Sequence, residues 1–252
     1  MVNYAALRSA LLLGGAIIGV AGLGIEGLSH AGVVPLEHPV RAALSLSYEQ
    51  NWPTWYSTCL LWSCAIGLSI AALASRIDTP RLTARWWALS AIFAYLSADE
   101  AIELHENLGE VVDYDGLLFF SWVVPGAAIT AVFAGAYFRF WRALPPATQR
   151  GFALAFALYV GGALGMELPL GAWAEDHGDD DMVYAGLDWI EEMLEIIGLS
   201  VFLLAIVDHL GRASFRLGFA PRSAPEASAP SSASASASAS ASASAESTSA
   251  PR

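Results

Sequence analysis

The chain has 252 residues, of which 56% are apolar and only 14% are charged, and it contains no lysine. Several of its apolar runs approach the roughly 20 residues that cross a lipid bilayer, so we expect an integral membrane protein with the bilayer as its main partner and no nucleic-acid partner. Apolar runs of this length exclude a closed β-barrel. The net charge is −12, and the positions of the charged residues along the chain are more informative than this total.

The apolar runs predict an all-α fold, a polytopic membrane protein built as a bundle of six transmembrane helices within residues 1–212. The predicted helices are residues 10–27, 55–74, 86–108, 117–141, 151–173 and 187–210. Arginines cluster at alternate ends of these runs, and the positive-inside rule then places both termini in the cytoplasm. We therefore expect a multi-pass protein of the bacterial cytoplasmic (inner) membrane.

The first apolar run has two interpretations. It follows Arg8 and ends near small residues, as a cleaved signal peptide does. It also ends on Glu26 and His30, which are spaced i, i+4 and therefore lie on one face of a helix. We favour a retained helix over a cleaved signal peptide because of this pair.

The outer loop that follows ends in the sequence YEQNWPTWYS. Trp52, Trp55 and Tyr56 are typical of an aromatic belt at a membrane surface, and Glu49 precedes them. In the next helix, Cys59 and Cys64 match neither a redox motif nor a zinc site, so we expect them to be small buried hydrophobic residues.

Two helices carry the same acidic pattern, D-x-x-x-E-x-x-E. The third predicted helix contains it as Asp99, Glu103 and Glu106, and the sixth contains it as Asp188, Glu192 and Glu195. Positions i, i+4 and i+7 fall within about 60° of one another, so each trio forms one stripe along its helix. Glu100 and Glu191 flank the stripes, while His105 points to another side.

The fifth helix adds Glu167 in its outer half, and its Gly161 and Gly165 are spaced for close contact between helices. Beyond the sixth helix, residues 213–252 consist mainly of repeated Ser and Ala. This composition predicts a disordered cytoplasmic tail.

Most acidic residues fall at the outer ends of the predicted helices, where Arg41 is the one arginine. An acid inside the bilayer costs about 2.5–3.5 kcal/mol, so the stripes must face the bundle interior or water. Clustered carboxylates without counter-ions need shared protons, water or a bound cation, and solvated helix ends would need only the first two. The predicted metal ligands are Asp99, Glu103, His105, Glu106, Glu167, Glu192, Glu195, Glu26, His30 and Glu49, with Glu100 and Glu191 as candidate catalytic proton carriers.

Ligand type narrows the predicted cofactor to a divalent metal. Oxygen ligands with one or two imidazoles suit Fe, Mn, Zn or Ca, and the absence of thiolate ligands argues against copper and structural zinc. The E-x-x-H pattern of helical di-iron proteins is absent, so the similarity to them is architectural only.

The stretches YEQNWPTWYS, LSADEAIELHE, GGALGMEL and EEMLEIIG occur in this order in the chain. Together they resemble small polytopic bacterial membrane proteins that have no assigned activity. The resemblance covers most of the six-helix region and supports treating the acids as one set, but it implies no reaction.

Three functions are consistent with these observations. A metal-dependent enzyme would act on a lipid or apolar substrate at the outer leaflet. A cation- or proton-coupled transporter would use the same acids as an entry site but needs polar groups across the whole span, which a homo-oligomer would have to provide. A sensor or non-catalytic membrane partner is the third function.

Overall fold

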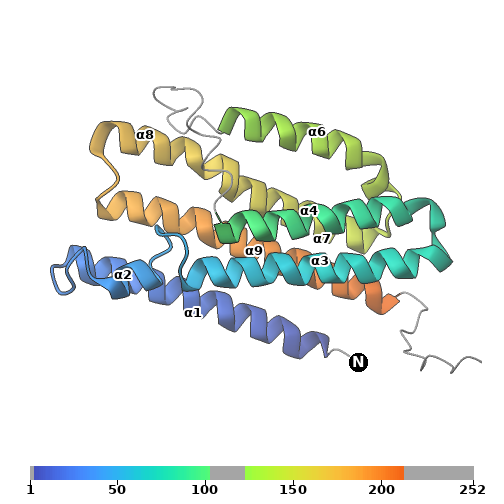
Figure 1. Cartoon of the computed structure of the whole chain (residues 1–252), viewed down its shortest axis with the longest axis horizontal. Coiled ribbons are helices and arrows are strands. Elements are labelled where there is room, and N and C mark those ends of the chain that lie inside the picture. Colours follow the sequence, from blue (N-terminus) through green and yellow to red (C-terminus); the bar gives the residue numbers. More distant parts are fainter. Residues whose placement is uncertain (1–2, 103–122, 213–252) are drawn as a thin grey trace, which may run out of the picture. The chain divides into compact units, whose positions relative to one another are not determined.

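The computed structural model describes residues 3–102 and 123–212, and every regular element in these ranges is helical (Figure 1). This confirms the predicted all-α class for the described part of the chain. The elements are α1 (Tyr4–His30), α2 (Pro39–Leu44), α3 (Trp52–Asp78), η1 (Pro80–Leu82), α4 (Thr83–Ile102), α6 (Val123–Arg142), α7 (Pro146–Val160), η3 (Gly161–Met166), α8 (Glu167–His177) and α9 (Met182–Arg212). The predicted tail, 213–252, lies outside the described residues.

Four helices are long and apolar enough to cross a membrane. They are α1, α3, α6 and the continuous helical stretch Pro146–His177. The helices α4 and α9, which carry the acidic residues Glu100 and Glu195, are not among these four. The membrane character of the chain is therefore supported by four helices.

Two of the helices, α3 and α9, begin earlier than their apolar runs because polar caps start them. The Asn51 side chain accepts a hydrogen bond from the Thr54 backbone N–H (3.1 Å), so α3 begins at Trp52. Asp181 accepts from the backbone N–H groups of Val183 and Tyr184 at 2.8 and 2.7 Å, ahead of α9. The hydrogen bond from the Tyr184 N–H is the main reason that the pKa of Asp181 is lowered. Partial desolvation raises this pKa but has the smaller effect.

The predicted fifth helix is a continuous helical stretch with a π-helical insertion. α7 leads into η3, where the backbone widens to a π-helix over Gly161–Met166, and α8 continues to His177. Such insertions are rare and are frequently found at functional sites. Here the insertion sets the position of α8 relative to α9.

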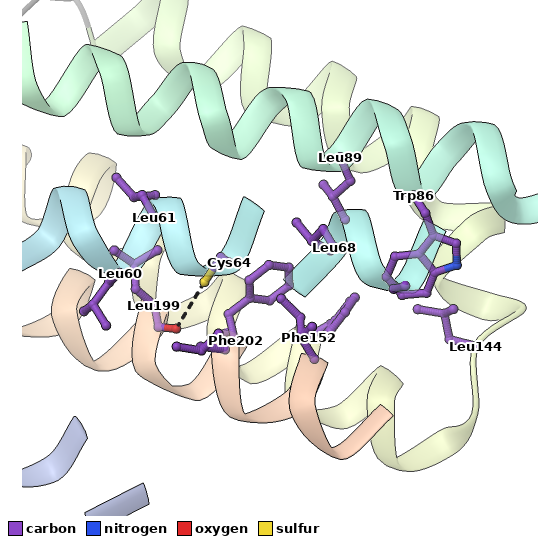
Figure 2. Close-up of a cluster of buried hydrophobic side chains, with 14 of the residues drawn as sticks. Leu60, Leu61, Cys64, Leu68, Trp86, Leu89, Leu144, Phe152, Leu199 and Phe202 are labelled. Atoms are coloured by element: carbon purple, nitrogen blue, oxygen red, sulfur yellow. Dashed lines mark hydrogen bonds between the residues drawn. The ribbon is translucent and has the colours of Figure 1, made fainter. Parts of the chain in front are cut away.

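α9 is the central helix of the described fold. It contacts α1 and α3 on one side and α7, η3 and α8 on the other, and Figure 1 shows it running between these groups. Figure 2 shows part of the apolar core around it, where Leu60, Leu61 and Phe152 pack against Leu199 and Phe202.

One cysteine belongs to this core, as expected. Cys64 is fully buried, and its thiol donates a hydrogen bond to the Leu199 carbonyl at 3.8 Å (Figure 2). Cys59 is partly buried, and both cysteines are free thiols. The prediction of a small buried hydrophobic residue is confirmed for Cys64.

Candidate functional site

The acids of α9 lie close to acids of two other helices. The charges of Glu195, in the same helix, and of Glu100, in α4, act on Glu192. The charges of Glu100 and of Glu167, in α8, act on Glu195. Glu191 completes the group through its interactions with Glu167 and Glu195. We call these five residues, Glu100, Glu167, Glu191, Glu192 and Glu195, the acidic cluster.

The acidic cluster is held together by a close contact between η3 and α9. A Cβ atom at Gly162 would lie 2.8 Å from the Glu191 carbonyl oxygen and 2.9 Å from Cγ of Glu195. Only glycine leaves room for this approach. The π-helical segment therefore sits directly against the two turns of α9 that carry the acids.

A tyrosine from α7 adds a hydroxyl group to the cluster. The Tyr159 side chain lies beside Glu195 and is also near the charges of Glu100 and Glu192. Its backbone packs tightly on α9, because a Cβ at Gly198 would lie 2.8 Å from the Tyr159 nitrogen. Tyr159 was not predicted as a site residue, since an aromatic residue within an apolar run is usually part of a hydrophobic core.

The acidic cluster is buried to different degrees and has little charge compensation. Glu191 is 9% exposed, and Glu100, Glu192 and Glu195 are partly buried. In residues 3–102 and 123–212, none of these four carboxylates forms an ion pair with an arginine or a histidine. Like charges in a partly buried site need a proton, water or a cation to neutralise them.

Asp188 lies on α9 one turn before the cluster and has one carboxylate oxygen without a partner. Its side chain is near Ser47, while its Oδ2 atom is buried without a hydrogen-bond partner in the described structure. An unsatisfied buried carboxylate oxygen is costly. Asp188 thus adds acceptor capacity at the edge of the cluster toward the α2–α3 connection.

The described carboxylates do not form a ready metal centre. No three His, Cys, Asp or Glu side chains of the described ranges lie close enough together to hold one metal ion. The predicted ligands Glu103, His105 and Glu106 lie outside the described residues. Asp99 is described, on α4 beside Glu100, and its charge acts on Glu100.

Glu26 lies in a separate buried ion pair. The guanidinium group of Arg41 donates hydrogen bonds to both carboxylate oxygens of Glu26 at 3.0–3.1 Å, and it also donates to the Tyr48 hydroxyl at 2.9 Å. His30 lies 3.4 Å from the same carboxylate, one turn along α1. The expectation that the outer acids have no protein counter-ion is therefore wrong for Glu26, because α2 brings Arg41 back against α1.

Glu49 lies apart from Glu26 along the α2–α3 connection. It lines an open surface hollow with Gln50, Trp52 and Trp55, and the rings of Trp52 and Trp55 meet edge to face at 6.0 Å. Both tryptophans are 60% exposed, as residues of an aromatic belt would be.

Comparisons with known proteins agree with a family of unassigned activity. No curated protein and no solved structure matches the chain. A family model described as a domain of unknown function (DUF8692) matches residues 10–210, which include every described acid of the cluster. The chain therefore belongs to the family defined by the domain of unknown function DUF8692.

Proposed function

We propose that this protein is a six-span membrane protein whose acidic cluster binds a divalent cation near the outer face, and that it uses the cation as an enzyme on a lipid or apolar substrate. One observation carries the proposal. Carboxylates from α4, α8 and α9 act on one another as like charges, and the described α9 acids among them have no ion-pair partner.

A cation is the neutralising partner that best fits this arrangement. Each unneutralised acid at membrane depth costs about 2.5–3.5 kcal/mol, so several close acids favour a bound positive charge strongly. Glutamate side chains have three rotatable bonds, so rotation of Glu192 and Glu195 toward Glu100 would close a coordination shell. Oxygen ligands select hard cations such as Ca²⁺ or Mn²⁺, and Fe or Zn would require His105 as well.

The proposed enzyme would use a bound cation to activate water or oxygen next to an apolar substrate. Glu100 and Glu191 are the candidate proton carriers, because Glu100 lies beside Asp99 and Glu191 lies beside Glu167 and Glu195. A transporter would need polar groups through the inner half of the span. α9 instead buries Leu199, Leu203 and Ile206 there, which favours the enzyme.

The first prediction concerns metal content. Protein purified in a mild detergent and treated with a weak chelator is expected to retain about one divalent ion per chain. The double variant Glu192→Gln/Glu195→Gln is expected to lose it, because two of the central oxygen ligands become neutral amides. Elemental analysis by mass spectrometry measures both.

The control for this experiment is Asp208→Asn. Asp208 is on α9 as well, but it is 37% exposed and pairs with Arg212 at 2.8 Å. Its replacement is expected to leave the metal content unchanged. Wild-type protein without metal, or equal metal in wild type and double variant, would refute the proposed cation site.

The second prediction tests the six-span topology. In a Cys59→Ser/Cys64→Ala background, a cysteine at Asp180 is expected to react with a membrane-impermeant maleimide added to intact cells. A cysteine at Thr79 is expected to react only after the cells are opened, because it lies at the arginine-bearing end of α3. Labelling of both positions in intact cells would overturn the proposed orientation.

A further inference from the structure

A large apolar cavity lies between α4, α6, α7 and α9. Its volume is about 600 Å³, within the range of roughly 300–1,000 Å³ that small-molecule sites occupy. Aromatic rings dominate its wall, including Phe93, Phe133, Tyr137, Phe156, Tyr159 and Phe202. A cavity of this size and lining suits one hydrocarbon chain or a small apolar ring system.

The helices that enclose the cavity hold α6 at its end near Arg142. Arg85 donates a hydrogen bond to the Ala136 carbonyl at 2.8 Å, and the Tyr137 hydroxyl donates to the Arg85 carbonyl at 3.2 Å. The ring of Phe140 meets that of Trp86 edge to face at 4.9 Å. These contacts fix the wall that α6 contributes to the cavity.

The cavity ends at the acidic cluster. Leu96 and Leu199 line it, and each lies four residues from an acid of the cluster, Glu100 and Glu195 respectively. In a helix, four residues correspond to about one turn, or roughly 6 Å along the axis. Tyr159 joins the two regions, because it lines the cavity and its side chain also lies beside Glu195.

The charge at this end of the cavity selects the head group of a ligand. The described lining contains no arginine, lysine or histidine, so it offers no positive charge to a phosphate or carboxylate. The nearby side chains of Glu191, Glu192 and Glu195 carry carboxyl oxygens, which can accept a hydrogen bond from an amine or carry the negative charge that an ammonium group would neutralise. Glu191 is 9% exposed and makes no hydrogen bond to another described residue. The ring of Tyr159 adds a surface to which a cation is attracted.

We propose that the cavity and the acidic cluster together form a binding site for a hydrophobic amine or quaternary ammonium compound. Its apolar chain would fill the space between α4, α6, α7 and α9, and its positive head would lie against Tyr159, Glu192 and Glu195. The inference rests on the proposed function in one respect, since both use the acidic cluster: the positive head of the amphiphile and the divalent cation would compete for Glu192 and Glu195.

The test uses three probes that share a chain and differ in head group: dodecyltrimethylammonium, dodecanol and dodecyl phosphate. Each is measured by equilibrium dialysis against the full-length protein in nanodiscs of neutral lipid, after bound metal has been removed with a strong chelator and with empty nanodiscs subtracted. We expect the ammonium probe to bind at least about ten-fold more tightly than the other two, a difference of about 1.4 kcal/mol.

Two variants separate the head-group site from the chain site. Glu195→Gln is expected to abolish the preference for ammonium while retaining binding of dodecanol. Ala134→Trp is expected to weaken all three probes, because its indole would fill the cavity from α6. Val132→Trp is the matched control, since Val132 is on the same helix and 73% exposed.

The outcomes distinguish this inference from the proposed cation site. Equal binding of the three probes, or unchanged binding in Ala134→Trp, would overturn the amphiphile site. The metal content of Ala134→Trp is measured in parallel and is expected to equal that of the wild type. Stoichiometric metal together with no ammonium preference would therefore refute this inference and leave the proposed cation site standing.

Discussion

Replacement of Arg41 with alanine is expected to destabilise the protein by about 3–5 kcal/mol, the range typical of breaking a buried ion pair by removing one partner. The side chains of Arg41 and Glu26 are 6% and 3% exposed, so the remaining carboxylate would stay buried. Arg41 also donates to Tyr48 and to the Leu36 carbonyl, so its loss would release the α1–α2 connection. The free energy of unfolding in mixed detergent micelles, monitored by circular dichroism, measures the effect.

The Arg212–Asp208 pair gives a matched control. It has a similar distance, 2.8 Å, but its side chains are 55% and 37% exposed. Arg212→Ala is expected to cost at most about 1 kcal/mol, because water screens exposed pairs. Adding Glu26→Gln to Arg41→Ala is expected to restore part of the stability, since the unpaired charge is removed. An equal loss of unfolding free energy in Arg41→Ala and Arg212→Ala would contradict a buried ion pair between Arg41 and Glu26.

The sequence identified the residues of this pair but not the pairing. Arg41 stands out as the one arginine of the outer loops, and the positive-inside rule treats it only as an exception. Glu26 was paired with His30 because helical spacing makes that neighbour visible. The Arg41 contact depends on how the prolines of the loop, Pro35 and Pro39, turn the chain back, which no periodicity shows.

The acidic cluster was predicted in part because helical periodicity is local. The D-x-x-x-E-x-x-E spacing places Glu192 and Glu195 on one side of a helix from sequence alone. The meeting of Glu195 with Glu100 and Glu167 depends on which helices are neighbours, and the sequence does not encode this visibly. The close packing that determines it occurs at Gly162, within a π-helical turn that has no recognised sequence signal.

The helix ends illustrate a similar limit. Apolar runs locate the part of a helix that lipid or core can accept, whereas capping side chains determine where the backbone turns begin. Asn51 and Asp181 start α3 and α9 before the apolar runs do. Both are residue types that commonly cap helices, so the polar residues ahead of each apolar run mark these boundaries in the sequence.

The packing of α7 on α9 leads to the second large expected effect, the destabilisation of the protein by Gly198→Ala. A methyl group at Gly198 would lie 2.8 Å from the Tyr159 nitrogen and 3.1 Å from the Ala155 carbonyl oxygen. Both are backbone atoms, so the helices must move apart. We expect a cost of about 1–3 kcal/mol, as for other overpacked cores, measured as the free energy of unfolding in micelles.

Gly186→Ala is the control on the same helix. No atom lies within 4 Å of a Cβ at Gly186, so this change is expected to stabilise α9 by about 0.5–1 kcal/mol through helix propensity alone. The same substitution is thus expected to lower the stability at Gly198 and to raise it at Gly186. This difference reports the contact of α9 with α7, because both positions are on one helix. Because separation of α7 from α9 would also draw the Tyr159 hydroxyl away from Glu195, Gly198→Ala is expected to lose metal and ammonium binding, whereas Gly186→Ala retains both. Equal stability of the two variants would show that α7 does not approach α9 this closely, and the acidic cluster would then lack the contact that positions Tyr159.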